Sequence, residues 1–223
     1  MPAQQQGHRH ASARQRALDA RVVVFGRAPV AGQVKTRLIP ALGAEGAARL
    51  HRQLMENIVG RLCASGPARV ELWVTPDTGH PCFAELAERW QLDIFVQEGQ
   101  DLGARMAHAA RSALSRAEAV ILVGTDCPDL SPDYLGAAIA GLEHQDAVLG
   151  PALDGGYVLL GLRSVENTLF ERMPWGSDRV AEVTQQRLDA LGWQWSRLAP
   201  LRDMDRPEDL AYLPARISPV PPA

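Results

Sequence analysis

Residues 22–38, VVVFGRAPVAGQVKTRL, combine an apolar run with a loop that carries glycines and cations. Gly26 and Gly32 allow the backbone to approach a ligand closely, and Lys35 and Arg37 supply charges that suit phosphate oxygens. The spacing matches neither the Walker A loop nor the GxGxxG dinucleotide fingerprint. A surface loop with two solvated cations is the competing interpretation. The segment therefore suggests a phosphate-binding loop that follows neither standard motif.

A second chemical feature is GTDCPDL, residues 124–130, which follows the apolar run AVILV. Such a run would deliver Asp126 to the carboxyl end of a strand, and Pro128 restrains the backbone just beyond it. Because Mg²⁺ binds one or two protein carboxylates together with substrate phosphates, this acid and the cationic loop are chemically compatible. Asp126 could instead only shape a turn, and Ser131 is expected to cap the next helix.

A third feature is LRDMDRPEDL, residues 201–210, which follows another expected strand. In extended chain Asp203 and Asp205 would point to the same side and could face one ion. Asp205 also begins a D-x-x-E capping box with Glu208, so a role as a helix cap competes with metal binding. Asp203 is therefore the preferred metal ligand of the two.

The segment GPALDGGYVLLGL, residues 150–162, places two adjacent glycines before an apolar strand. The glycines allow close approach to a ligand, while Asp154 and Tyr157 offer a carboxylate and a phenol. A plain turn explains the glycines equally well. Further along, Trp175 could form a substrate wall or belong to the core, and Ser177 could cap a helix.

The elements that would position these residues alternate between helices and strands. Helical strides and short apolar runs predict an α/β sandwich with a mainly parallel sheet, whose ligands gather at the carboxyl ends of its strands. The expected helices span 44–64, 82–90, 102–115, 132–143 and 178–191, and the expected strands span 22–25, 70–74, 92–96, 120–123, 147–149, 157–160 and 193–198.

Composition fits a globular enzyme-sized unit. The chain has 223 residues, 46% of them hydrophobic, and a net charge of −3. These values favour a packed core and give no reason to expect nucleic acid as a partner. No apolar run approaches the roughly 20 residues of a membrane span. Cys63, Cys82 and Cys127 lack metal-site spacing, so a reducing cytoplasm is the expected setting.

The two ends of the chain differ from its middle. Residues 1–20 are rich in Gln, Arg, His and Ala, which predicts a disordered tail rather than a secretory signal. Residues 214–223 form a Pro-rich tail that cannot continue a helix. A single domain is expected at 21–213, and its oligomeric state is left open.

Six segments together carry a family resemblance: FGRAPVAGQVKTRLIPALG, QEGQDLGARM, GTDCPDL, GPALDGGYVLLGL, PWGSDRV and MDRPEDL. Their order resembles a bacterial glycosyltransferase-A-like family that is linked in part to arsenosugar biosynthesis. It is similar, more distantly, to nucleotidyltransferases that make molybdopterin guanine dinucleotide or activate phospholactate with GTP. The resemblance covers about residues 21–212.

This resemblance implies a three-layer α/β/α sandwich of the nucleotide-diphospho-sugar transferase (GT-A) type, with a mixed, mostly parallel sheet. It implies a nucleotide in the amino-terminal half, an acceptor in the carboxyl-terminal half, and Mg²⁺ or Mn²⁺ as the cofactor. The family's D-x-D motif is reduced here to a single acid, in Thr125-Asp126-Cys127. The implied roles are phosphate binding for Arg27, Gly32, Lys35 and Arg37, nucleotide binding for Asp101, Gly103 and Arg105, acceptor binding for Asp154, Gly155, Gly156, Tyr157 and Trp175, and metal binding for Asp126 and Asp203.

The favoured function is metal-dependent glycosyl transfer from a nucleotide-diphospho-sugar to a small-molecule acceptor. Lys35, Asp126 and Asp154 are the expected catalytic residues, with Asp154 as a general base. The alternative is a nucleotidyltransferase that joins a nucleoside triphosphate to a phosphorylated small molecule, since the cations beside the glycine loop suit a triphosphate. A non-catalytic nucleotide-binding protein is a third possibility. Neither nucleic acid nor a membrane is an expected partner.

Overall fold

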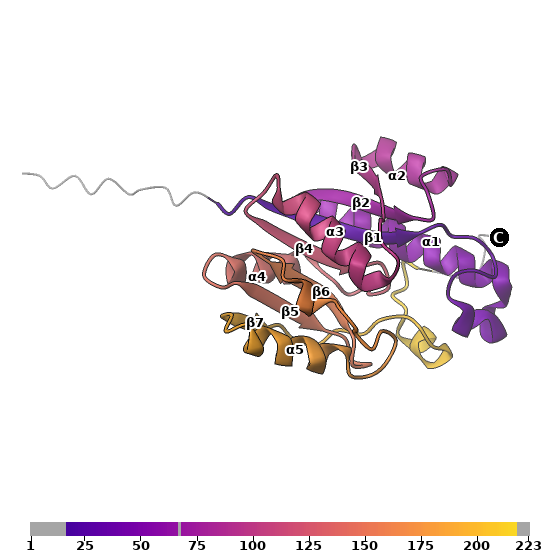
Figure 1. Ribbon diagram of the computed structural model, residues 1–223. Helices are drawn as coiled ribbons and strands as arrows, with labels where there is room; N and C mark the ends of the chain where they lie inside the picture. Colours follow the sequence, from indigo (N-terminus) through magenta and orange to yellow (C-terminus); the bar gives the residue numbers. More distant parts are fainter. Residues whose placement is uncertain (1–16, 67, 218–223) are drawn as a thin grey trace, which may run out of the picture.

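A seven-stranded sheet forms the centre of the protein, in a computed structural model that describes residues 17–66 and 68–217 (Figure 1). The strand order is β3-β2-β1-β4-β6-β5-β7, and only β6 runs antiparallel to its neighbours. The mixed, mostly parallel sheet expected from the sequence is therefore confirmed. The strands are β1 (Ala20–Arg27), β2 (Arg69–Thr75), β3 (Asp93–Val96), β4 (Ala119–Gly124), β5 (Ala147–Pro151), β6 (Tyr157–Leu162) and β7 (Trp195–Arg197).

Helices cover both faces of this sheet and complete three layers (Figure 1). One face packs against α1, α2 and α4, and the opposite face packs against α3 and α5. The helices are α1 (Ile39–Ser65), α2 (Pro81–Trp90), α3 (Leu102–Leu114), α4 (Pro132–Leu142) and α5 (Val180–Ala190), with short 3₁₀ helices at Thr36–Leu38, Asn167–Leu169 and Pro207–Tyr212.

The apolar run at the start of the chain forms the central strand β1. Val22 and Val24 pack on the α1 side of the sheet, and Val23 packs on the α3 side. All three are fully buried, because a parallel strand with helices on both faces has no solvent side. This burial explains why the run is continuously apolar rather than alternating.

Helix boundaries follow local capping and glycine geometry. Ser131 accepts a hydrogen bond from the Tyr134 amide and caps α4, as predicted. The first helix begins at Ile39 rather than at 44, and Gly43, with φ of 69°, breaks it near its start. Ser177 accepts a hydrogen bond from the Arg179 amide and shapes a turn, so α5 begins only at Val180. The predicted cap at Ser177 is therefore wrong.

A third apolar cluster connects the start of α1 to the carboxyl-terminal segment. Met204 is fully buried there against α1, and Ile217 packs into the same cluster. Ala20 and Ile217 had been assigned to the tails, but both are buried in the fold. Most of the expected disordered tail and Pro-rich tail, residues 1–16 and 218–223, lies outside the described residues. Among the helices that the structure describes, none has the length and apolarity needed to cross a bilayer.

Met204 should anchor the segment that carries Asp203 and Asp205. We expect Met204→Ala to lower the free energy of unfolding by about 2–4 kcal/mol, because it removes fully buried side-chain volume. Leu210→Ala, at a partly buried position of the same cluster, serves as the control and should cost less. Urea unfolding measures both values, and equal losses would contradict the anchoring role.

Candidate functional site

The carboxyl ends of the parallel strands meet the start of β6 at one edge of the sheet. Three hollows lie side by side along this edge, and Gly124 at the end of β4 lines all of them. A Cβ atom on Gly124 would meet nothing within 4 Å. The hollows therefore form one cleft that is joined over bare backbone.

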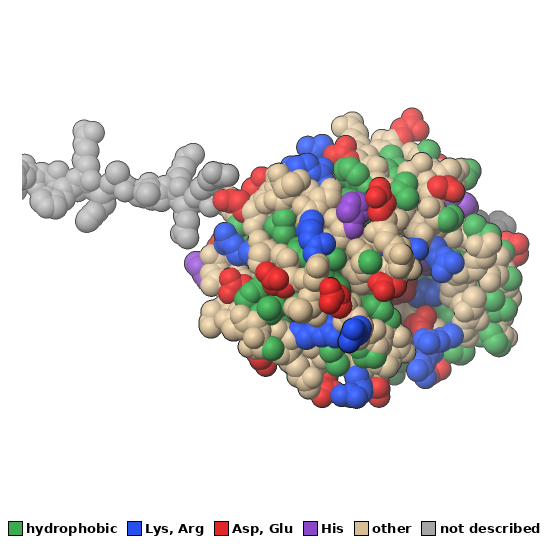
Figure 2. Space-filling view, in the orientation of Figure 1, with side chains coloured by type: hydrophobic (Ala, Val, Ile, Leu, Met, Phe, Trp, Pro, Cys, Tyr) green, Lys and Arg blue, Asp and Glu red, His purple; other side chains and the backbone are tan. Residues whose placement is uncertain are grey.

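The largest hollow, about 570 Å³, lies over the ends of β1 and β4 and the start of α3. Its charged lining is mainly cationic, as the resemblance implied for a phosphate site. The cations are Arg27, Lys35, Arg37 and Arg105, with Asp126 and Asp205 as the acids. Acidic and basic side chains are otherwise interspersed over the face that Figure 2 shows.

Lys35 is a buried ammonium in the lining of this hollow. Its Nζ atom lies 2.9 Å from Asp126 Oδ2 and donates a hydrogen bond to the Met204 carbonyl. Asp205 Oδ1 is 3.9 Å away. Only 3% of the Lys35 side chain is exposed. Lys35 thus holds the ends of three segments together and does not project freely into the hollow.

The carboxylate of Asp126 is held in its charged form. Burial disfavours its charge, but the nearby Lys35 ammonium and the charge interaction with His51 outweigh this effect and lower the pKa of Asp126 below its usual value. The Met204 amide donates to the Asp126 carbonyl at 2.8 Å, which fixes the backbone as well. Asp126 is therefore a positioned anion that lines both the cationic hollow and a smaller one beside it.

His51 on α1 also lies at this site, although sequence reasoning missed it. Its Nε2 contacts the Arg27 carbonyl at 3.0 Å, and since a carbonyl only accepts, Nε2 carries the proton. Nδ1 has no hydrogen-bond partner and lies 4.0 Å from Asp126 Oδ1. Burial lowers the pKa of His51, so the ring is neutral near pH 7. The missed signal was a polar residue that continues the buried helical stripe of Met55 and Ile58.

Asp205 forms ion pairs with the cationic loop and does not cap a helix. Its carboxylate pairs with Arg37 and lies near Lys35. Asp209, and not Asp205, caps the 3₁₀ helix, because its carboxylate accepts hydrogen bonds from the amides of Asp205 and Arg206. The capping alternative for Asp205 is therefore wrong.

A smaller hollow of about 160 Å³ contains three acids, Asp126, Asp154 and Asp203. The bridge between Ala152 and Leu201 continues the parallel pairing of β5 with β7, and each residue precedes one of these acids by two positions. Burial and the charges of Asp154 and Asp126 raise the pKa of Asp203 to about 6. The hollow thus concentrates negative charge that its protein surroundings do not fully balance.

This acidic hollow fits a divalent cation that is held jointly with a ligand. Within the described residues, no three His, Cys, Asp or Glu side chains are close enough to hold a metal ion by themselves. Mg²⁺ and Mn²⁺ bind hard oxygen ligands, and Mg²⁺ commonly completes its shell with substrate phosphates. Asp126 and Asp203 are therefore suitable ligands only together with oxygens of a bound ligand, such as phosphate oxygens.

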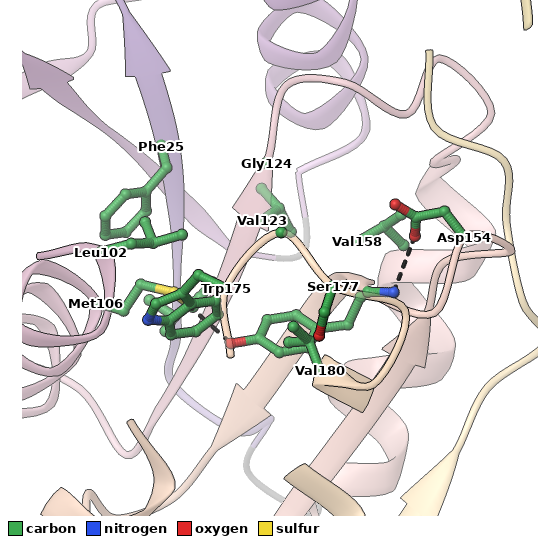
Figure 3. Close-up of a pocket in the computed structure, with 14 residues that line it drawn as sticks. Phe25, Leu102, Met106, Val123, Gly124, Asp154, Val158, Trp175, Ser177 and Val180 are labelled. Carbon is green, nitrogen blue, oxygen red and sulfur yellow. Dashed lines mark hydrogen bonds between the residues drawn. The ribbon is translucent and has the colours of Figure 1, made fainter. Parts of the chain in front are cut away.

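The third hollow, about 220 Å³, is mostly apolar and lies between α3, β6 and the loop before α5. Figure 3 shows Phe25, Leu102, Met106 and Trp175 gathered at one end and Asp154 at the other. Tyr157 meets Trp175 edge to face, with ring centroids 6.3 Å apart. Its hydroxyl points to Met106 Sδ at 3.7 Å.

Several residues expected at the site lie elsewhere. Asp101 caps α3 by accepting from the Ala104 amide. A Cβ on Gly103 would come within 2.5 Å of the Phe170 carbonyl oxygen, so Gly103 permits close packing of α3 and does not line the cationic hollow. Gly155 packs in the same way against the Asp178 backbone. Gly32 is exposed with φ of 79° and is not among the residues that line the hollows.

The remaining expected residues do reach the cleft. Arg27, Lys35, Arg37 and Arg105 line the cationic hollow, and Gly156 and Tyr157 line both the acidic and the apolar hollows. Gln97, which sequence reasoning missed, follows β3 and donates from Nε2 to the Gly26 and Trp73 carbonyls. Its position directly after a strand was the available signal.

The matched family model is described as "uncharacterized protein conserved in bacteria (DUF2064)" and covers residues 58–177. That span is more than half of the chain. The chain belongs to the DUF2064 family. None of the curated proteins matches its sequence.

Similarity to solved structures covers most of the chain. A candidate nucleotide-diphospho-sugar transferase from Desulfovibrio desulfuricans G20 is 32% identical, with a TM-score of 0.76, over 84% of this chain and 82% of that one. A cytidylyltransferase from Leptospira borgpetersenii is 15% identical, with a TM-score of 0.56, over 90% of each chain. Glucosyl-3-phosphoglycerate synthase from Mycobacterium tuberculosis, bound to Mn²⁺, UDP and its product, is 11% identical, with a TM-score of 0.52, over 87% of this chain and 75% of that one.

These likenesses confirm the nucleotide-diphospho-sugar transferase fold for this DUF2064 member, and they confirm the expectation of a transferase enzyme. The two more distant structures show the fold alone. The arsenosugar link stays a prediction, since no comparison supports it.

Replacing Lys35 tests its structural role. We expect Lys35→Met to lower the free energy of unfolding by about 2–3 kcal/mol at pH 7, because Asp126 and the Met204 carbonyl lose a buried partner. Arg37→Met is the matched control and should cost less than about 1 kcal/mol, because 55% of the Arg37 side chain is exposed. Urea unfolding at several pH values gives both numbers.

The same titration has an expected pH dependence. The lowered pKa of Asp126 stabilises the native protein above its ordinary pKa of 3.8, and this contribution is lost as the pH falls through the native pKa. Without Lys35 this loss should shrink. If Lys35→Met leaves the loss of unfolding free energy at acidic pH unchanged, this result would argue against the ion pair.

The raised pKa of Asp203 predicts the opposite pH dependence of stability. Because its native pKa of about 6 lies above the ordinary 3.8, the native protein loses stability as the pH rises through this window. Asp203→Asn should therefore stabilise the ligand-free protein at pH 7 by on the order of 1–2 kcal/mol and leave it nearly unchanged at pH 4. Urea unfolding at both pH values tests this, with Asp129→Asn as the control. Equal effects of Asp203→Asn on the free energy of unfolding at both pH values would contradict a raised pKa of Asp203.

Proposed function

We propose that this protein is a metal-dependent glycosyltransferase that uses a nucleotide-diphospho-sugar. One observation carries the proposal: a single cleft is divided into a cationic hollow and an acidic hollow that meet at Gly124. A sugar diphosphate needs cations for its phosphates on one side and a base for the acceptor on the other. The two hollows supply both in adjoining positions.

The donor would lie in the cationic hollow over β1 and β4. Arg27, Arg37 and Arg105 line it and suit the phosphate oxygens. Lys35 holds Asp126, so it would act mainly by keeping that acid charged and placed. A bound cation adds positive charge that favours departure of the diphosphate, and Asp126 and Asp203 would hold it with donor oxygens.

The transfer step requires that the acceptor oxygen form a bond to the anomeric carbon while the bond from that carbon to the diphosphate oxygen breaks. The nucleoside diphosphate leaves with the electron pair, and the acceptor proton passes to a base. Asp154 lines both the acidic and the apolar hollows and is the carboxylate available for this proton.

The acidic hollow favours glycosyl transfer over the nucleotidyl alternative. A phosphorylated acceptor is already anionic, so it needs no base and would be repelled by Asp154. A neutral hydroxyl group gains from a nearby carboxylate instead. Similarity to a cytidylyltransferase and to a glycosyl-transferring synthase is comparable, so fold alone does not choose between them.

Thermal unfolding with ligands tests this function. We expect a UDP- or GDP-sugar with Mn²⁺ or Mg²⁺ to stabilise the protein, by about 2.7 kcal/mol at a hundred times the dissociation constant. Asp126→Asn should lose the metal-dependent part, whereas Asp129→Asn, at a neighbouring exposed position, should retain it. Stabilisation by one nucleoside triphosphate and by no nucleotide-sugar would contradict glycosyl transfer and favour nucleotidyl transfer.

A further inference from the structure

The apolar hollow beside Asp154 has a lining that is unusual for a sugar-phosphate site. Of its fourteen residues, Asp154 is the one that carries a charge, and there is no Lys, Arg or His among them. Phosphate and carboxylate groups are normally held by such cations. The lining therefore offers an anionic molecule no charged partner.

Its walls offer apolar contact instead. Phe25, Met106 and Trp175 face the same space (Figure 3). Leu102 also lines it, with 43% of its surface exposed. An aromatic or aliphatic body would remove this surface from water and gain stacking or edge contacts with the rings.

The position of the hollow identifies which substrate it serves. Cations line the adjoining larger hollow, where the proposed function places the donor phosphates. The two spaces meet at Gly124, Phe25 and Leu102, which line both. A molecule in the apolar hollow would thus border the donor hollow at this end and reach Asp154, which also lines the acidic hollow, at the other.

The volume limits the size of this molecule. The hollow measures about 220 Å³, below the roughly 300–1,000 Å³ of sites for drug-sized ligands. It suits one ring or a short branched chain rather than an oligosaccharide or a peptide.

We propose that the acceptor is a small neutral alcohol with an apolar, ring-sized body, held between Met106, Leu102 and Trp175 with its hydroxyl group toward Asp154. That the bound alcohol acts as the acceptor rests on the proposed function, but the binding preference can be measured without any donor. Phosphorylated and carboxylated molecules of the same size are excluded by the uncharged walls and by the Asp154 carboxylate.

Ligand-observed NMR titration with three matched probes tests the preference: benzyl alcohol, phenyl phosphate and benzoate. We expect benzyl alcohol to bind with an affinity about tenfold or more above that of each anion. Trp175→Ala should weaken benzyl alcohol about tenfold, because it removes one aromatic wall. Trp90→Ala, on the opposite face of the sheet, should leave the affinity unchanged.

A charge placed in the wall should reverse the preference. Of the three hollows, Ser177 lines only the apolar one. Ser177→Arg should therefore narrow or invert the difference in affinity between benzyl alcohol and phenyl phosphate. Ser164→Arg, the same change at an exposed turn, should not. Tighter binding of either anion to the unmodified protein, or no effect of Trp175→Ala, would overturn the proposal.

Competition separates the acceptor from the donor. Uridine or guanosine should not displace benzyl alcohol, and displacement would show that the hollow holds a nucleobase, which overturns the inference. If benzyl alcohol binds as expected but no nucleotide-sugar stabilises the protein, the proposed function fails while the binding preference stands. If a nucleotide-sugar stabilises the protein and only anionic probes bind, the acceptor inference alone fails.

Discussion

The ion pair between Lys35 and Asp126 is the interaction on which the rest of the cleft depends. A buried ammonium is costly unless it has close partners, and here those partners come from the end of β4 and from the segment around Met204. Satisfying one charge therefore fixes three pieces of chain that are far apart in the sequence. Asp126 remains ionised as a result, and Asp203 is kept beside it at the edge of the sheet.

Strand direction supplies the second constraint. Because β6 runs antiparallel between β4 and β5, a short turn replaces the long crossover that a parallel pair would need. That turn carries Asp154 to the same edge as Asp126. An all-parallel sheet would have placed a helix at this point of the chain. The single reversed strand thus brings Asp154 to the acidic hollow, beside the cationic one.

Continuous apolar runs made the strands, and with them Asp126, predictable from the sequence, since a buried strand must end where polar chemistry begins. Spacing in the loop before α3 was less informative. Asp101 turns back to cap the helix, Gly103 faces Phe170, and Arg105 faces the cleft, because successive helical residues point about 100° apart. The pairings of Lys35 with Asp126 and of Asp205 with Arg37 join positions more than ninety residues apart. No local pattern encodes such contacts, so they required the fold.

Gly124 gives the cleft a property that a side chain there would remove. The cationic hollow and the apolar hollow meet at Gly124 and share only the side chains of Phe25 and Leu102. Trp175 and Ser177, in the loop before α5, line the apolar hollow and not the cationic one. Under the proposed function, substitutions in this loop would therefore change the acceptor that is bound while the donor hollow keeps its form.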